Sequence, residues 1–195
     1  MSIAHSHAAA VDRPATHRYS NLAIALHWLL GAALVAVFAL GIYMADLPFS
    51  PRRLQLYNWH KWAGVVILLL SALRLVWRIT HRPPALPQAM QDAMPAWQKA
   101  AHHGTHHALY LLFFAVPLLG WAYSSAAGFP VVLFGALPLP DFVPVSTTLA
   151  EVLKPLHKLS ALALAALVLL HVAAALKHQW LDRDNLLARM LPGTR

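Results

Sequence analysis

Long apolar runs alternate along this chain with short polar connections that are rich in proline. A transmembrane helix needs about 20 mostly apolar residues, because each residue adds about 1.5 Å and the hydrocarbon core is about 30 Å thick. Four runs reach this length: Leu22–Ala45, Asn58–Ile79, His107–Ala127 and Leu153–Leu176. The pattern therefore predicts an all-α membrane protein, folded as a bundle of four transmembrane helices.

Prolines punctuate the connections between these runs and predict irregular loops. They are Pro48 and Pro51, then Pro83, Pro84, Pro87 and Pro95, then Pro130, Pro138, Pro140 and Pro144. The third connection also carries an apolar stretch, Phe129–Leu139, which we expect in the membrane interface. Pro117 lies inside the third run and predicts a kink, which a membrane helix tolerates when neighbours satisfy the freed carbonyl.

The basic residues predict the orientation of the bundle, because cytoplasmic segments carry an excess of Lys and Arg. The N-terminal segment, second connection and C-terminal segment with their flanks hold ten: Arg13, Arg18, Arg74, Arg78, Arg82, Lys99, Lys177, Arg183, Arg189 and Arg195. The other two connections with their flanks hold five: Arg52, Arg53, Lys61, Lys154 and Lys158. We therefore expect both termini in the cytoplasm. Residues 1–20 are expected to form a flexible cytoplasmic tail, residues 21–180 the single membrane domain and residues 181–195 a C-terminal cytoplasmic tail.

Composition excludes several classes of function. Charged residues make up only 11% of the chain, and the formal net charge of +8 comes from basic residues at the ends of apolar runs. This layout suits anionic lipid headgroups and supplies no basic face for nucleic acid. The chain has no cysteine, which excludes disulfides, iron–sulfur clusters, thiolate zinc sites and covalently attached c-type haem.

Four of the 13 histidines lie at or just inside the ends of the predicted spans: His27, His60, His157 and His171. His157 and His171 are 14 residues apart, which is about 21 Å of rise and close to four whole turns. They therefore share one face of the last helix, one near each membrane surface. The up-and-down topology places His27 level with His171, and His60 level with His157.

Two histidines facing each other at one depth match the geometry of a b-type haem, whose iron takes one axial imidazole from each side. One turn beyond each histidine stands a small residue that leaves room for a porphyrin: Gly31, Gly64, Ala161 and Ala175. Hydrogen bonding between the four histidines is an alternative. A zinc, copper or non-haem iron site is another, but it needs three or more clustered ligands, usually with carboxylate or sulfur, and no span contains an acidic residue. The pattern favours two non-covalent haems.

Several motifs resemble the bacterial cytochrome b561 family. They are Tyr19-Ser20-Asn21-Leu22 followed by Ala25-Leu26-His27-Trp28-Leu29, Asn58-Trp59-His60-Lys61 with Gly64, Leu156-His157-Lys158-Leu159, Leu170-His171-Val172-Ala173-Ala174, and Asp184-Asn185-Leu186-Leu187 with Arg189-Met190. The resemblance covers roughly Tyr19–Pro192. It implies a four-helix protein of the bacterial cytoplasmic (inner) membrane with two haems b per chain, ligated by the four histidines already paired by depth. The chain differs from the family in its longer N-terminal tail and in the doubled histidines before the third helix.

The resemblance also implies electron transfer between quinone and a redox partner, and one similar branch oxidises periplasmic superoxide and reduces ubiquinone. We therefore expect a di-haem electron-transfer protein, an oxidoreductase of this type, with superoxide as the favoured donor. An alternative is a cytochrome b anchor subunit that exchanges electrons with a partner dehydrogenase or hydrogenase. A histidine-lined ion transporter is a third reading, which the lack of intramembrane carboxylates disfavours.

Other polar residues near the predicted haems have more than one interpretation. Trp28, His178 and Arg183 are candidates for a quinone site near the inner surface, or ordinary interface anchors. His102, His103, His106 and His107 could relay protons, bind a peripheral metal, or form a hydrated helix start. Arg74 could pair with a haem propionate or extend to the membrane surface. The five basic residues of the outer connections leave a positive excess that would attract an anion or an acidic donor protein.

Overall fold

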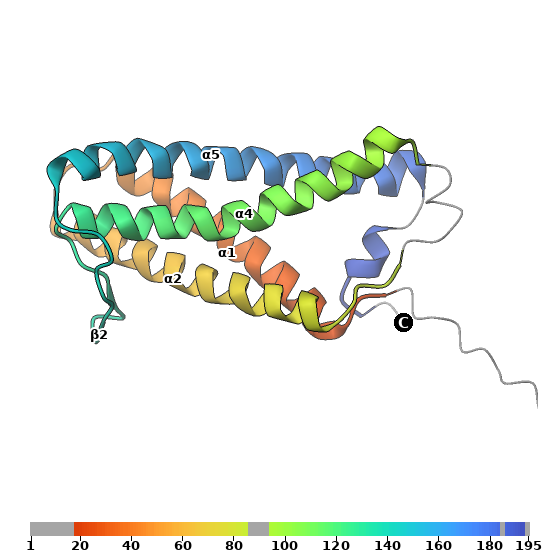
Figure 1. The fold of residues 1–195 in the computed structure, drawn as a ribbon, viewed down its shortest axis with the longest axis horizontal. Coiled ribbons are helices and arrows are strands. Elements are labelled where there is room, and N and C mark those ends of the chain that lie inside the picture. The colour runs from red at the N-terminus through yellow and green to blue at the C-terminus, as the bar shows by residue number, and fades with distance from the viewer. Residues whose placement is uncertain (1–17, 86–93, 184–185, 194–195) are drawn as a thin grey trace, which may run out of the picture.

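The fold is described from a computed structural model, which covers residues 18–85, 94–183 and 186–193. Four long helices run along one another: α1 (Asn21–Ala45), α2 (Pro51–Thr80), α4 (Ala96–Ala126) and α5 (Thr147–Lys177) (Figure 1). Each is long and apolar enough to cross a membrane. The predicted four-helix membrane fold is therefore confirmed among the described residues. Residues 1–17, most of the expected N-terminal tail, lie outside the described part of the chain.

Three of the four helices begin earlier than the apolar pattern predicts. The second starts at Pro51 rather than Asn58, the third at Ala96 rather than His107, and the fourth at Thr147 rather than Leu153. The added turns are polar, so hydropathy reports only the part of each helix that lies in hydrocarbon. Three serines, at positions 20, 50 and 146, begin α1, α2 and α5 by accepting a hydrogen bond from a backbone N–H three residues later. Such N-caps each contribute about 1 kcal/mol.

Helix packing leaves much of the apolar surface uncovered. α1 packs on α2, α2 on α4, and α4 on α5. Only a few large side chains are buried in the bundle, whereas Leu69, Leu111 and Leu169 are 62%, 69% and 71% exposed. In water such a surface would aggregate, but in a bilayer it faces lipid tails as apolar as itself. α4 continues through Pro117 as an unbroken helix, and its ribbon bends along its length (Figure 1).

The apolar stretch of the third connection folds into a small antiparallel hairpin, β1 (Val132–Leu133) and β2 (Leu137–Pro138). Hydropathy alone did not predict these two-residue strands. The turn between them holds Phe134 and Gly135 at positive φ. Trp62 of α2 donates its indole N–H to the Val132 carbonyl at 2.7 Å, which ties the hairpin to the end of the bundle where α2 begins.

The C-terminal segment folds back across the other end of the bundle. α5 continues into a π-helical turn, η1 (His178–Asp182), and Arg183 then turns the chain with φ +53°. A short 3₁₀ helix, η2 (Leu187–Met190), lies against the start of α1, where Trp28 donates to the Met190 carbonyl at 2.7 Å and Arg18 to the Leu191 carbonyl at 2.8 Å. Within residues 186–193, the segment expected as a tail is thus bonded to the bundle.

Arg189 should be the main anchor of this segment. Its guanidinium donates to the carbonyls of Pro84 and Ala85 at 2.8 and 2.9 Å and lies 5.7 Å from the centre of the Tyr19 ring. Because a hydrogen bond from a charged donor contributes roughly 1.5–3 kcal/mol, Arg189→Met should speed amide hydrogen exchange in residues 186–193 by about tenfold or more. Arg52→Met, at the opposite end of α2, is the matched control and should leave that exchange unchanged. Equal exchange rates in Arg189→Met and the parent protein would show that Arg189 does not hold the segment.

Candidate functional site: two pairs of histidines inside the bundle

Two histidine pairs lie at two levels of the bundle. His60 of α2 and His157 of α5 face each other with ring centres 6.1 Å apart and ring planes 86° apart. His27 of α1 and His171 of α5 face each other with centres 6.2 Å apart and planes 75° apart. The structure therefore brings together the same partners that the depth argument paired. All four rings are half-buried.

The spacing within each pair suits two imidazoles that bind one metal ion between them. A metal–imidazole bond is about 2.0 Å, and the bound nitrogen lies about 1.1 Å from the ring centre, so two rings on opposite sides of one ion are about 6.2 Å apart. The centres of two directly hydrogen-bonded imidazoles would be closer, at most about 5.1 Å apart, because the nitrogens would be about 2.9 Å apart. No hydrogen bond joins either pair among the described residues. Nor does any group of three or more His, Asp or Glu side chains suited to a metal ion occur there.

We call His60 and His157 the outer pair, and His27 and His171 the inner pair. A glycine of the neighbouring helix lies against each ring of the outer pair. A Cβ at Gly120 of α4 would come within 2.9 Å of His157 Cε1, and a Cβ at Gly41 of α1 within 3.0 Å of His60 Cε1. Real Cβ atoms essentially never approach as closely as the distance at Gly120, and the distance at Gly41 is tighter than most. A larger residue at either position would therefore displace the imidazole beside it. The sequence analysis singled out Gly31 and Gly64 instead, where an added Cβ would meet nothing within 4 Å.

The carbonyl four residues before each of these glycines faces the same ring. Val116, four residues before Gly120, has its carbonyl oxygen 3.0 Å from His157 Nδ1, and only a protonated Nδ1 can donate to it. This bond holds the imidazole in the tautomer that leaves Nε2 free to bind a metal. Val37, four residues before Gly41, stands in the same relation to His60, but its carbonyl lies outside good hydrogen-bond geometry.

On each of the four helices, the residue at the level of the outer pair and the residue at the level of the inner pair are 14 positions apart. On α5 the residues are His157 and His171, and on α2 they are His60 and Arg74. On α1 they are His27 and Gly41, and on α4 they are His106 and Gly120. Fourteen residues bring a helix almost back to the same face, so each helix contributes one position to each level. The outer level holds two histidines and two glycines; the inner level holds three histidines and an arginine.

The inner level contains a third imidazole, which the sequence analysis named only as one of the four histidines before the third span. His106 lies with its ring centre 5.5 Å from that of His171, at 85°. Its Nδ1 faces the His102 carbonyl at 2.7 Å, and the same bond joins His107 to the carbonyl of His103. The histidine cluster is therefore part of the first turns of α4 and not a loop before it. The 14-residue step from Gly120 to His106 was the signal in the sequence that could have identified His106.

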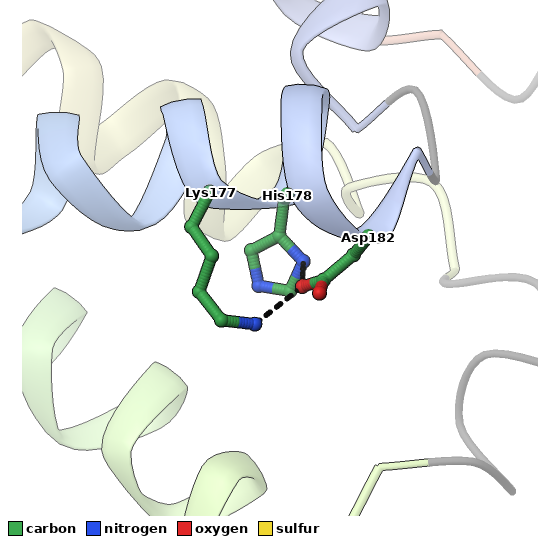
Figure 2. Close-up of polar contacts among 3 residues, drawn as sticks. All are labelled: Lys177, His178 and Asp182. Carbon is green, nitrogen blue, oxygen red and sulfur yellow. Dashed lines mark hydrogen bonds and ion pairs between the residues drawn. The ribbon is translucent and has the colours of Figure 1, made fainter.

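The three candidate quinone residues lie in different surroundings. Trp28 has its ring 5.5 Å from His27 and lines a surface pocket of about 400 Å³ with Arg18, Asn21 and Pro192. His178 lies at the end of α5, with Nδ1 3.1 Å from an Asp182 carboxylate oxygen that also accepts from Lys177 at 2.6 Å (Figure 2). Arg183 ends the π-helical turn. Of the three, Trp28 is the one adjacent to a paired histidine in sequence and in ring contact with it.

The basic residues of the first and third connections differ in whether they form hydrogen bonds within the protein. Lys61 donates to the carbonyls of Phe129 and Pro130, and Arg53 to the Tyr57 hydroxyl at 3.3 Å. The remaining three are exposed: Arg52, Lys154 and Lys158. Arg52 also lines an open pocket of about 580 Å³ beside Trp59, the residue before His60.

Comparison with known proteins agrees with this architecture. Residues 18–193 match the family described as prokaryotic cytochrome b561. The chain is 32% identical to cytochrome b561 homolog 2 of Escherichia coli over 89% of its length and 91% of the relative's. It is 33% identical to the probable superoxide oxidase CybB of Yersinia pestis, over 91% of its length and 98% of the relative's, and 31% identical to cytochrome b561 homolog 1 of E. coli, over 90% and 98%.

Members of this family bind haem b and are electron-transport oxidoreductases. Two pairs of histidines inside four apolar helices fit such a protein. The resemblance noted in the sequence is therefore confirmed. This chain is a multi-pass protein of the bacterial inner membrane and belongs to the prokaryotic cytochrome b561 family.

Proposed function

We propose that the chain binds two haems b and transfers electrons across the membrane from periplasmic superoxide to a membrane quinone, with ubiquinone as the expected acceptor. The observation that carries the haem assignment is the 6.1 and 6.2 Å spacing of two imidazole pairs at two depths. Each bound haem supplies a one-electron iron couple. The two pairs are 14 residues apart on α5, so the chain provides two sites about 21 Å apart along its axis.

The residues of the chain have distinct roles in this proposal. His60 and His157 hold the outer haem, and Gly120 with the Val116 carbonyl fixes the ring of His157. His27 and His171 hold the inner haem. The uncovered apolar faces of the helices keep lipid around both sites and exclude water.

The proposed orientation has both termini in the cytoplasm, since ten of the 15 Lys and Arg residues flank that side. Residues 21–180 then form the membrane domain, and residues 1–20 and 181–195 its cytoplasmic extensions. The outer level near the hairpin faces the periplasm, where exposed cations would attract an anionic donor.

The proposed reaction balances with these groups. Two superoxide anions lose one electron each and become two molecules of oxygen. One quinone gains the two electrons and two protons and becomes a quinol. The name of the Yersinia pestis relative, probable superoxide oxidase, supports superoxide as donor. Trp28 is the favoured contact for the quinone headgroup, because it lines a pocket beside His27. His178 and Arg183 remain secondary candidates at the same end.

Removing single histidines tests the haem assignment. The purified parent protein should contain two six-coordinate haems b per chain by pyridine haemochrome analysis. His60→Ala and His157→Ala should each remove the same haem, and His27→Ala and His171→Ala the other, because partners across levels are about 21 Å apart. His103→Ala, an exposed histidine of α4, is the control and should keep both. One haem or none in the parent protein, or loss of the same haem in His27→Ala and His60→Ala, would contradict the proposal.

Gly120→Ala should empty the outer site without touching an iron ligand. The added Cβ would lie 2.9 Å from His157 Cε1, so the imidazole must shift from the position in which it faces His60. We expect loss of one haem and an unchanged spectrum of the other. Gly104→Ala, where a Cβ meets nothing within 4 Å, should keep both haems and raise helix stability by up to about 1 kcal/mol. Two intact haems in Gly120→Ala would show that the close approach has no role.

Salt dependence tests the donor. Replacing Arg52, Arg53, Lys154 and Lys158 with Gln should slow haem reduction by superoxide about tenfold without loss of haem, because these charges raise the encounter rate of an anion. Since the Debye length falls from about 10 Å at 0.1 M salt to about 3 Å at 1 M, the parent protein should also slow as salt rises, and the variant less. Stopped-flow rates would measure both.

Arg78, Arg82 and Lys99, replaced together by Gln at the other end of the bundle, form the control and should leave the rate unchanged. A flat salt profile of the parent protein would remove the charge argument for an anionic donor. Reduction only in the presence of a dehydrogenase or hydrogenase would favour the anchor-subunit alternative.

A further inference from the structure

Arg74 occupies the inner-level position of α2 that corresponds to His60 at the outer level. The two residues are 14 apart, as are His157 and His171 on α5, so both pairs lie on one helix face. Arg74 lies close enough to His27, His171 and His106 to interact electrostatically with all three. It therefore belongs to the inner site and does not merely flank it.

The guanidinium of Arg74, a half-buried residue, has two buried nitrogens without a hydrogen-bond partner. Its Nε and Nη1 atoms are inaccessible to solvent and have no hydrogen-bond partner among the described residues. Three other basic side chains of the bundle do have partners: Lys61 donates to two loop carbonyls, Arg53 to Tyr57 and Lys177 to Asp182. A buried guanidinium without a counter-charge is costly, because the Coulomb attraction that would offset its desolvation is missing.

No carboxylate of the bundle can supply that counter-charge. α1, α2 and α4 contain no Asp or Glu at all. α5 carries Glu151 in its second turn, 20 residues before His171, and Asp182 beyond its end is held by Lys177 and His178. Among the described residues, the helices around the inner level therefore offer Arg74 no carboxylate, so an anion from outside these helices would be needed to pair with it.

We propose that Arg74 is the ion-pair partner of a propionate carboxylate of the inner haem, an inference that rests on the haem assignment of His27 and His171. The propionates are the two anionic groups of haem b, and a guanidinium binds a carboxylate through two parallel hydrogen bonds. A lipid phosphate has the same anionic chemistry and would be the other source of a partner. The outer level has no counterpart to Arg74, because Gly41 and Gly120 hold the two positions there that carry no histidine.

The pairing predicts an electrochemical effect confined to one haem. A cation beside a haem favours the reduced form, which carries one positive charge fewer. Arg74→Gln should therefore lower the ratio of reduced to oxidised inner haem about tenfold at a fixed potential, a shift of about 59 mV for a one-electron couple. Arg74→Lys keeps the charge and should shift less. Arg78→Gln, one turn further along α2 with its side chain over the Tyr110 ring, is the matched control and should shift the potential of the inner haem much less than Arg74→Gln.

Redox titration of the purified full-length variants, followed in the visible spectrum, measures this shift. Both potentials unchanged in Arg74→Gln, or equal shifts in Arg74→Gln and Arg78→Gln, would overturn the pairing. If Arg74→Gln purifies with one haem fewer, haem content decides: recovery in Arg74→Lys supports a charge partner, and equal loss in both variants overturns it.

Infrared spectroscopy separates the two sources of the anion. In redox-difference spectra of protein whose haem carries ¹³C at the propionate carboxyl carbons, the labelled carboxylate bands should move in Arg74→Gln and stay in Arg78→Gln. Unmoved labelled bands together with a changed potential would assign the Arg74 partner to lipid phosphate and overturn the propionate pairing. The haem assignment itself fails separately, when the parent protein lacks two haems; a parent protein with two haems and an unaffected Arg74→Gln variant refutes only the role of Arg74.

Discussion

The organisation of this bundle depends on the cost of placing a polar ring in hydrocarbon. Lipid tails offer no hydrogen bonds, so an imidazole inside a span needs a partner at its own depth. Each of the four histidines faces a second histidine across a helix boundary, with ring centres 6.1 or 6.2 Å apart, and the proposed haem iron would be the partner that both bind. Depth in an α-helix is set by residue number alone, at about 1.5 Å per residue. The 14-residue step on α5 therefore fixes the heights at which α1 and α2 must present their own histidines.

The same step on the other helices makes the two levels chemically different. At the outer level, Gly41 and Gly120 let neighbouring helices approach until an added Cβ would crowd an imidazole. The four repeat positions of that level hold two glycines and two histidines, and no other ionisable side chain. At the inner level the matching positions are His27 and His106, with Arg74 on α2, so the neighbours are polar and charged. The two proposed haems would therefore lie in different electrostatic surroundings, although both sites use positions related by the same 14-residue step. Such a difference in surroundings is one way to give two haems different reduction potentials.

Most of this arrangement could be predicted from the order of residues in the sequence. Span length, the paired depths of the four histidines and the family resemblance all came from positions in the sequence, and the structure agrees with them on the helices and on the proximity of the pairs. Contacts between residues far apart in sequence did not follow. Gly41 and Gly120 matter because of which neighbour faces them, whereas Gly31 and Gly64, chosen for their spacing from a histidine on the same helix, border open space. The hairpin and the fold-back of η2 were missed for the same reason. Trp62 and Arg189 hold them by bonds to backbone carbonyls, which no side-chain pattern reports.

Exposed and buried cations in this protein differ in how strongly water and salt screen their charges. A charge exposed to water, such as Arg52, Lys154 or Lys158, interacts weakly with any single partner but adds to a field that extends about 10 Å at 0.1 M salt. Such charges suit the attraction of a small diffusing anion. A buried charge has the opposite properties, because low dielectric strengthens its interaction with one fixed partner and makes it costly without that partner. Two guanidinium nitrogens of Arg74 are buried, whereas Arg52, Lys154 and Lys158 are exposed, so the same type of residue can steer an anion at one surface and hold one in place inside the bundle.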